Sequence, residues 1–271
     1  MTPRGAGPAR ERAGIEALVP DDGPLFLAVG VFDGIHVGHR SLIERLVAEA
    51  GRRDARPAVL TFDSHPDALI SGEAPPLLVD PGERIRLLED AGVEVVVVVH
   101  FDAELRATTY DRFVERIRAR TSLAGFLMTP DAAFGRDRAG TPEAVARLGA
   151  RDGFDVVIAS PLRLDGDKVS SSAIRALIAA GDLAAAARLL GRAYGVVGEP
   201  RPGAAGRPAL GFPVPVALPP SGGYRVRLGD VRDGEGANAV VTVDREGGTV
   251  SLDDATPLVG GGTRIAVTFT G

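Results

Sequence analysis

The sequence predicts an α/β fold, a doubly wound parallel sheet, followed by a small all-β domain of barrel-like type. Apolar runs and amphipathic stretches alternate five times between residues 25 and 191, which is typical of a parallel sheet covered by helices. After Tyr194 the chain is turn-rich and only short β-like segments follow. We therefore expect a flexible lead-in at 1–22, an α/β domain at 23–195 and a β domain at 196–271.

Five apolar runs are expected to form the sheet. The run VEVVVVV is continuous, as in strands that are buried on both faces. In such sheets, ligands bind beyond the carboxyl ends of the strands, so functional residues are expected in the loops that follow them. The predicted strands lie at 25–29, 57–62, 93–99, 123–129 and 154–160.

Amphipathic stretches between these runs are expected to form helices. The stretch at 141–153 has Thr141 as an N-cap, Pro142 at the first helical position and a glycine at its end. The predicted helices lie at 39–51, 82–92, 110–120, 141–153, 170–181 and 182–191. In the β domain, the β-like segments are YRVRL, AVVTV and TRIAVTF.

The amino-acid composition of the chain excludes several classes of function. The chain has 271 residues and a formal net charge of −5, which gives no electrostatic reason to expect a nucleic-acid partner. It has no cysteine, so disulfides, thiolate zinc sites and thiol nucleophiles are excluded. Its apolar runs are too short to span a bilayer, and its first residues lack an apolar signal core. We expect a cytoplasmic protein with no membrane partner, and homo-oligomer formation stays open.

The stretch VGVFDGIHVGH, residues 29–39, places two histidines on a glycine-rich turn between a strand and a helix. Such a turn directs backbone N–H groups and the positive end of the helix dipole at an anion. His36 and His39 add two side-chain donors, which suits the charge that develops in phosphoryl-type transfer. The alternatives are a metal pair or structural histidines. A metal would need a third ligand, and the other histidines lie in separate segments.

The stretch VSSSAIR, residues 169–175, has three serines at a helix start, followed by Arg175. Capping the helix needs only one serine. Hydroxyls, amides and a guanidinium together make a seat for a polyphosphate. An ordinary helix cap is the alternative.

Two further loops carry polar residues. TFDSHP, residues 61–66, has a proline that holds His65 in an extended backbone, and a simple turn is the alternative. PDAAFGRDRAG, residues 130–140, offers Asp131 beside flexible glycines. His100 is interpreted as structural.

These motifs resemble a known family. GVFDGIHVGH together with SSSAIR is similar to the adenylyltransferase module of the prokaryotic bifunctional riboflavin kinase/FMN adenylyltransferases, or FAD synthetases. The resemblance runs from about Leu25 to Tyr194 and includes TFDSHP (TFDPHP in the family), FGRDRAGT and the terminal LLGRAY. The HxGH element alone marks a wide nucleotidylyltransferase superfamily, and the combination is more specific.

The resemblance implies a Rossmann-like nucleotidylyltransferase domain and a reaction. The phosphate of FMN attacks the α-phosphorus of ATP, which binds with Mg²⁺, and the products are FAD and pyrophosphate. No all-protein magnesium cage is visible, so the metal is expected to come with ATP. By position, the catalytic residues are His36, His39 and Arg175, the ATP-binding residues are Gly30, Phe32, Asp33, Gly38, Ser171 and Ser172, and the FMN-binding residues are His65 and Asp131.

The chain departs from the family in its flavin loop. Ala132 and Ala133 stand where the family has a bulky aromatic and a polar residue, and Ser172 stands for a threonine. The alanines leave the flavin pocket emptier. A transfer to a modified flavin or another phosphomonoester is therefore an alternative function.

The second departure concerns the β domain, a riboflavin kinase barrel in the family. GAAGRPALGFP resembles its entrance, but Val214-Pro215-Val216 replaces the threonine and asparagine that serve Mg-ATP there. A valine side chain cannot coordinate a hard cation. The strand with the glutamate base and the helix after it are not recognisable before Gly271.

The expected function is therefore an FMN adenylyltransferase whose kinase module is inactive. A bifunctional enzyme and a non-catalytic flavin- or nucleotide-binding protein are the alternatives. Deleting 197–271 is expected to leave FAD formation largely intact, unless the module buries apolar surface of the first domain.

Overall fold

The structure is a computed structural model that describes residues 9–164, 166–203, 208–230, 236–252 and 264–270. The chain folds as two compact units, and the segments that form them alternate along the sequence. The first unit comprises Met1–Phe32, Gly38–Ala74 and Ile85–Lys168. The second comprises Asp33–Val37, Pro75–Arg84 and Val169–Gly271.

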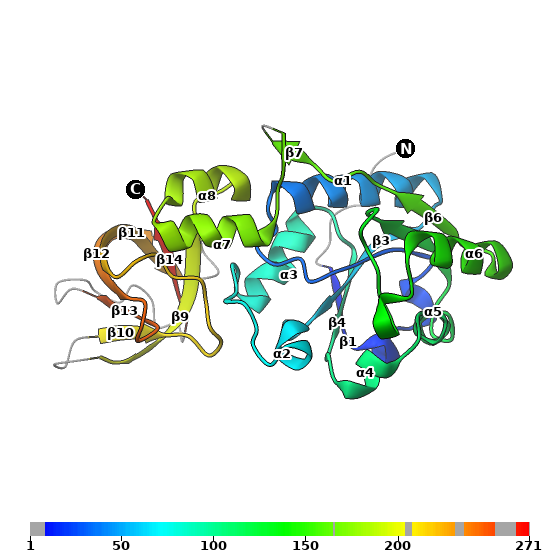
Figure 1. Ribbon diagram of the computed structural model, residues 1–271, viewed down its shortest axis with the longest axis horizontal. Helices are drawn as coiled ribbons and strands as arrows, with labels where there is room; N and C mark the ends of the chain where they lie inside the picture. The colour runs from blue at the N-terminus through cyan, green and yellow to red at the C-terminus, as the bar shows by residue number, and fades with distance from the viewer. Residues whose placement is uncertain (1–8, 165, 204–207, 231–235, 253–263, 271) are drawn as a thin grey trace. The chain divides into compact units, whose positions relative to one another are not determined.

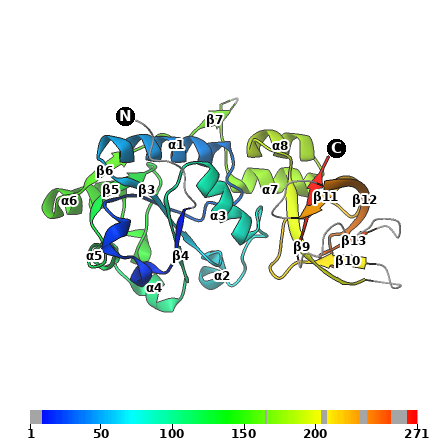
Figure 2. The same cartoon turned by 180° about the vertical axis from the view of Figure 1, so that it is seen from behind.

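The first unit contains a parallel sheet with the strand order β1-β4-β3-β2-β5-β6. Helices α1 and α5 lie on opposite sides of this sheet (Figures 1 and 2). The predicted α/β class is confirmed, and all five predicted strands are present, with β1 as an addition. The strands are β1 (Arg10–Ala13), β2 (Leu25–Val29), β3 (Arg56–Phe62), β4 (Val95–Val99), β5 (Leu123–Met128) and β6 (Asp155–Ile158).

Helices connect the strands as the apolar periodicity predicts. Thr141 caps α6 as expected, accepting a hydrogen bond from the Ala144 N–H at 3.3 Å. Short elements without an apolar pattern, α2, α4 and the β7–β8 hairpin, are additions. The helices are α1 (Val37–Arg52), α2 (Asp67–Ile70), α3 (Pro81–Asp90), α4 (Ala103–Ala107), α5 (Tyr110–Arg118), α6 (Pro142–Asp152), α7 (Ser171–Ala180) and α8 (Leu183–Leu190), and the hairpin strands are β7 (Arg163–Leu164) and β8 (Asp167–Lys168).

The strand order defines where a ligand is expected. β2 lies between β3 and β5, so the chain leaves β2 for one side of the sheet and returns later on the other side. This reversal is the switch point at which doubly wound sheets bind ligands. The loops that begin at Gly30, after β2, and at Thr129, after β5, flank that point.

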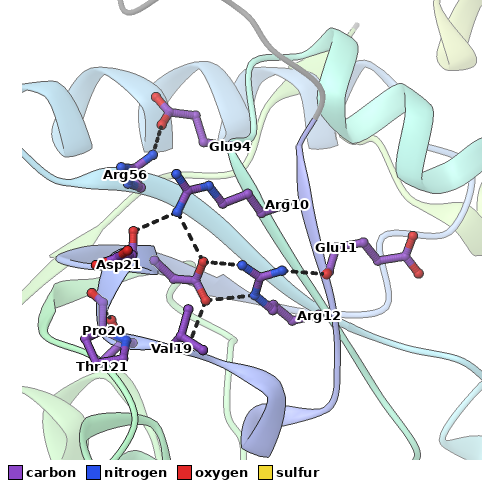
Figure 3. Close-up of polar contacts among 10 residues, drawn as sticks. Arg10, Glu11, Arg12, Val19, Pro20, Asp21, Arg56, Glu94 and Thr121 are labelled. Carbon is purple, nitrogen blue, oxygen red and sulfur yellow. Dashed lines mark hydrogen bonds and ion pairs between the residues drawn. The ribbon is translucent and has the colours of Figure 1, made fainter.

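The N-terminal segment differs from the predicted flexible lead-in. β1 pairs in parallel with β4, with Arg10 opposite Val95, and two short turns, η1 (Ile15–Ala17) and η2 (Pro20–Asp22), follow. The side chains of Arg10 and Arg12 point toward one carboxylate (Figure 3), that of the fully buried Asp22. Arg12 binds it through two nitrogens, at 2.8 and 2.7 Å. The sequence RERA has no apolar alternation, so it carries no signal that predicts this strand.

The Asp22 carboxylate is held in its ionised form. Burial disfavours the charge, but the hydrogen bonds from Arg12 and from the backbone N–H of Val19 outweigh it, so the pKa of Asp22 is lowered. The ion pair thus joins β1 to the turn that leads into β2.

The second unit contains a closed antiparallel barrel with the order β10-β13-β12-β11-β14-β9. The predicted barrel-like domain is therefore confirmed. Residues Tyr194 and Phe269 stack with their ring centroids 5.8 Å apart. The strands are β9 (Gly195–Pro202), β10 (Pro208–Gly211), β11 (Gly222–Asp230), β12 (Gly236–Asp244), β13 (Thr249–Leu252) and β14 (Ile265–Phe269).

The barrel shares its apolar core with the two helices before it. Ile174 and Ile178 of α7, Leu190 of α8 and the loop residue Leu78 are at most 1% exposed and belong to one cluster with the inward barrel side chains, such as Val241. The sequence groups α7 and α8 with the α/β domain, whereas they pack with the barrel in this unit. Within the described residues, none of the helices has the length and apolar composition that a membrane span requires.

Candidate active site

The loop after β2 has an unusual backbone. Phe32 and Ile35 have positive φ angles, 52° and 37°, in addition to Gly34 at 83°. A positive φ is rare for a side chain branched at Cβ, such as isoleucine, and persists only where surrounding contacts impose it. Such strain is frequent at functional sites.

Asp33 of this loop has a buried carboxylate with several partners. Its side chain is 2% exposed, and both carboxylate oxygens accept the backbone N–H of Leu78, at 3.0 and 3.1 Å. The Nη2 atom of Arg175 pairs with the same carboxylate at 2.6 Å. Burial raises the pKa of Asp33, against the opposing charge of Arg175. The sequence predicts both residues at the site, and the structure pairs them with each other.

The three serines before Arg175 have three different environments. Ser170 is the helix cap, accepting the Ala173 N–H at 3.2 Å. The hydroxyl of Ser171 donates to the backbone oxygen of Asp33 at 3.0 Å. Ser172 is exposed in the first turn of α7. The capping interpretation therefore holds for one serine, and the second joins the serine motif to the loop after β2.

His36 is buried in this loop, with 4% of its surface exposed. Burial, and secondly the nearby charge of Arg192, lower the pKa of His36 to about 4. Its imidazole is therefore neutral at pH 7. Arg192 itself donates from Nη1 to the Gly34 carbonyl at 2.8 Å. No motif in the sequence singles out Arg192, which lies in the segment LLGRAY.

His39 lies in the first unit, on the first turn of α1. The helix begins at Val37, two residues before the predicted start, so Gly38 also lies in this turn. The His39 ring is 5.2 Å from the Phe32 ring, centroid to centroid, with 47° between the planes. A Cβ atom on Gly30 would lie 3.1 Å from the Phe32 ring, so the small residue lets this ring lie against the backbone.

Asp131 follows β5 in the first unit. Its carboxylate accepts hydrogen bonds from Lys168 at 2.5 Å and from the Thr129 hydroxyl at 2.7 Å. These two bonds, first that of Lys168, lower the pKa of Asp131 to about 2. Lys168 is the only lysine in the chain. Ala132 of the same loop packs against the core of this unit.

His65 follows β3, and its Nδ1 atom accepts the backbone N–H of Asp67 at 3.2 Å. His65 is thus in a different loop from Asp131. The strands that precede these two loops, β3 and β5, are separated by β2 in the sheet. His100, interpreted from sequence as structural, is exposed and pairs with Asp63 at 2.7 Å. Hydrogen bonding to Asp63 raises the pKa of His100. In the described part of the chain, no three histidine, aspartate or glutamate side chains come together as a metal site.

Known proteins with similar sequences agree on one family. The family model described as FAD synthetase matches residues 19–173, more than half of the chain. A bifunctional riboflavin kinase/FMN adenylyltransferase of Escherichia coli (strain K12) is 31% identical over 189 residues, which cover 69% of this chain and 60% of that protein. That of Haemophilus influenzae is 34% identical over 69% of this chain and 61% of its own length. The match therefore spans about three fifths of these relatives.

A longer match and a solved structure extend the comparison. The Bacillus subtilis protein of the same description is 28% identical over 225 residues, 77% of this chain and 69% of its own length. A crystal structure of a macrolide-efflux protein from Streptococcus pneumoniae superposes with a TM-score of 0.75 at 22% identity, covering 96% of this chain and 89% of that one, so it shares the fold. With the glycine-rich loop, the paired histidines and the three serines at 170–172 inside the matched segment, the chain belongs to the FAD synthetase family.

Proposed function

We propose that the chain is an FMN adenylyltransferase, which transfers AMP from ATP to FMN and releases pyrophosphate. The observation that carries this proposal is the junction at Asp33. Its backbone oxygen accepts the Ser171 hydroxyl, and its carboxylate pairs with Arg175. Two anion-binding motifs about 140 residues apart are thus held together, one on a glycine-rich loop and one on a helix start.

The proposed reaction needs positioned donors and no covalent intermediate. An oxygen of the FMN phosphate forms a bond to the α-phosphorus of ATP, and the bond from that phosphorus to the bridging oxygen breaks. The bonding electrons leave with pyrophosphate. His36 and His39 are proposed to donate N–H bonds to the phosphate oxygens on which charge grows. The neutral state of His36 suits this role, because a neutral imidazole keeps one N–H donor.

We assign the binding of the departing pyrophosphate to the start of α7. Ser172 is exposed there, and Arg175 supplies a positive charge one turn further on. Ser171 is proposed to act through the backbone of Asp33. Magnesium would be held by the phosphate oxygens of ATP, its preferred hard ligands, since the described residues form no carboxylate cluster for it. When bound, it would neutralise phosphate charge.

The FMN end of the site is proposed to include His65 and Asp131, whose loops both begin at carboxyl ends of strands. Gly30 and Phe32 would line the nucleotide pocket. Because Ala132 packs against the core and offers no polar group, a phosphomonoester other than FMN is the second candidate acceptor.

We further propose that the barrel does not phosphorylate riboflavin. Its segment at 214–217 forms backbone hydrogen bonds with Leu77: the Leu77 N–H donates to Pro215 and the Ala217 N–H donates back, both at 2.9 Å. The side chains of Val214 and Val216 offer no oxygen to a cation. This segment therefore supports the loop at 75–78, and its side chains offer no ligand to Mg-ATP.

The test is to incubate the purified chain with Mg-ATP and either FMN or riboflavin, and to separate the flavins by chromatography. We expect FAD from FMN and unchanged riboflavin. FMN or FAD formed from riboflavin would show an active kinase. If FMN yields no FAD, the main proposal is wrong, and a panel of other phosphomonoesters identifies the acceptor, if one exists.

The role of His39 has its own test. His39→Ala is expected to lower kcat by about a hundredfold or more, the scale for a lost donor to developing charge. His100→Ala is the matched control, because His100 is exposed and follows β4, which is not adjacent to β2. Thermal unfolding checks that both variants fold. Turnover near that of the wild type in the His39 variant would contradict the assignment.

A further inference from the structure

One arginine outside the proposed roles holds the loop that carries His36. Arg192 follows α8, after Gly191 has ended that helix in the left-handed conformation with φ 72°. Its Nη1 atom donates to the carbonyl oxygen of Gly34 at 2.8 Å and lies 3.5 Å from that of Ile35. These carbonyls belong to the two residues immediately before His36.

The backbone at this point needs such a contact. Gly34 and Ile35 both have positive φ angles, 83° and 37°, and Ile35 is fully buried. A buried carbonyl without a hydrogen-bond partner is costly, and a strained backbone is kept only when neighbouring groups impose it. The guanidinium of Arg192 gives the Gly34 carbonyl a hydrogen-bond partner, and it holds the backbone at this residue in its strained conformation.

Tight packing brings the end of α8 close to this loop. A Cβ atom on Gly34 would lie 3.0 Å from a methyl of Leu78, and one on Gly191 would lie 2.9 Å from a methyl of Val37. Both glycines are therefore needed for the close approach. Arg192 is fixed beside the loop by the packing of the helix end, in addition to its hydrogen bonds.

We propose that Arg192 is a positioning residue for adenylyl transfer: by binding the Gly34 carbonyl, it fixes the backbone that presents His36 to the phosphates of the nucleotide. This inference rests on the proposed function. Because Arg192 acts through the loop, its loss displaces a donor that acts in the transition state. The effect is expected in kcat and much less in KM.

The kinetic test compares Arg192→Gln with Arg188→Gln. The glutamine is too short to reach the Gly34 carbonyl, and Arg188 is an exposed residue of α8, the helix that precedes Arg192. We expect Arg192→Gln to lose about 10- to 100-fold in kcat, as for a displaced catalytic group, with KM for ATP within about threefold of wild type. Arg188→Gln should keep wild-type kcat. Arg192→Lys retains a donor on a long stem and should recover kcat to within about threefold.

Two kinetic results would overturn the positioning role. One is a kcat of folded Arg192→Gln within about twofold of the wild-type value. The other is an equal loss in Arg188→Gln. An inactive wild-type chain would instead overturn the proposed function, so the two failures are distinguishable.

A second measurement does not depend on turnover. A hydrogen bond to a carbonyl changes the resonance of the amide that follows it in the chain, here the amide of Ile35. In isotope-labelled protein, Arg192→Gln should shift the Ile35 and His36 amides, and Arg188→Gln should not. If Arg192→Gln does not fold, Arg192→Met, which keeps the aliphatic stem without a donor, replaces it: unshifted loop amides in that variant would overturn the proposal.

Discussion

Deletion of residues 197–271 is expected to abolish FAD formation by unfolding the second unit. This reverses the expectation from sequence, which held only if the barrel buried no apolar surface of the preceding segments. Ile174 and Ile178 of α7 are fully buried in the core that they share with the barrel strands, and so are Leu190 of α8 and Leu78. The deletion would expose these side chains to water.

The size of the effect follows from this burial. Each fully buried side chain of this size contributes about 1.5–3 kcal/mol, so the four together contribute about 6–12 kcal/mol. If the deletion exposed half of their surface to water, the loss would be about 3–6 kcal/mol. A whole domain is stable by only about 5–15 kcal/mol. The truncation thus removes a large part of the stability that holds Asp33, Ser171 and Arg175 together.

The assay measures urea unfolding and FAD formation in parallel for the full chain and the truncated chain. Val240→Thr in the full chain is the control, because this side chain is 48% exposed on the barrel surface. We expect it to leave both properties unchanged. A truncated chain that folds and keeps wild-type turnover would refute the reasoning, because the shared core would then not be needed for the site.

Two further predictions concern buried charges. Asp33→Asn leaves Arg175 without its buried partner and should lower the free energy of unfolding, measured in urea, by about 3–5 kcal/mol. Asp21→Asn, at an exposed aspartate, is the control. An equally small loss of stability in both variants would contradict the importance of the ion pair. His36 takes up a proton near pH 6.5 when unfolded but only near about pH 4 when folded. Stability should therefore be full above about pH 6.5, fall by up to about 3 kcal/mol as the pH drops, and level off below about pH 4. His36→Gln should flatten this dependence, and an identical pH dependence in the variant would show that His36 is not its cause.

The parts of the fold that could be predicted from sequence are those in which apolar residues form runs or a regular alternation. The run at 95–99 and the alternation around it predict a parallel sheet, because buried strands must be continuous and apolar. β1 has no such signal, since its backbone pairs with β4 while Arg10 and Arg12 bind Asp22. The order of the strands and the core that α7 shares with the barrel depend on contacts between residues that are distant in sequence. The periodicity of apolar residues does not predict such contacts.

The sequence predicts which residues form the candidate site, but it does not predict their individual contacts. The pattern predicts an anion site at the loop after β2 and at the start of α7, because helix starts present backbone N–H donors to anions. It does not distinguish a residue that binds substrate from one that holds the loop. Asp33 and Arg175 are 142 residues apart and bind each other, and Arg192 binds a backbone carbonyl without any motif of its own.

These contacts indicate a structural role for the barrel within the second unit. Leu77 is hydrogen-bonded to the barrel segment at Pro215 and Ala217, and the next residue, Leu78, donates to the Asp33 carboxylate. Arg175 also donates to the Pro76 carbonyl at 2.8 Å. Residues 76–78 therefore connect the barrel to the loop that carries His36 by consecutive hydrogen bonds. Because a strained loop keeps its conformation only while its surroundings impose it, we expect the barrel to hold the loop that carries His36 in place.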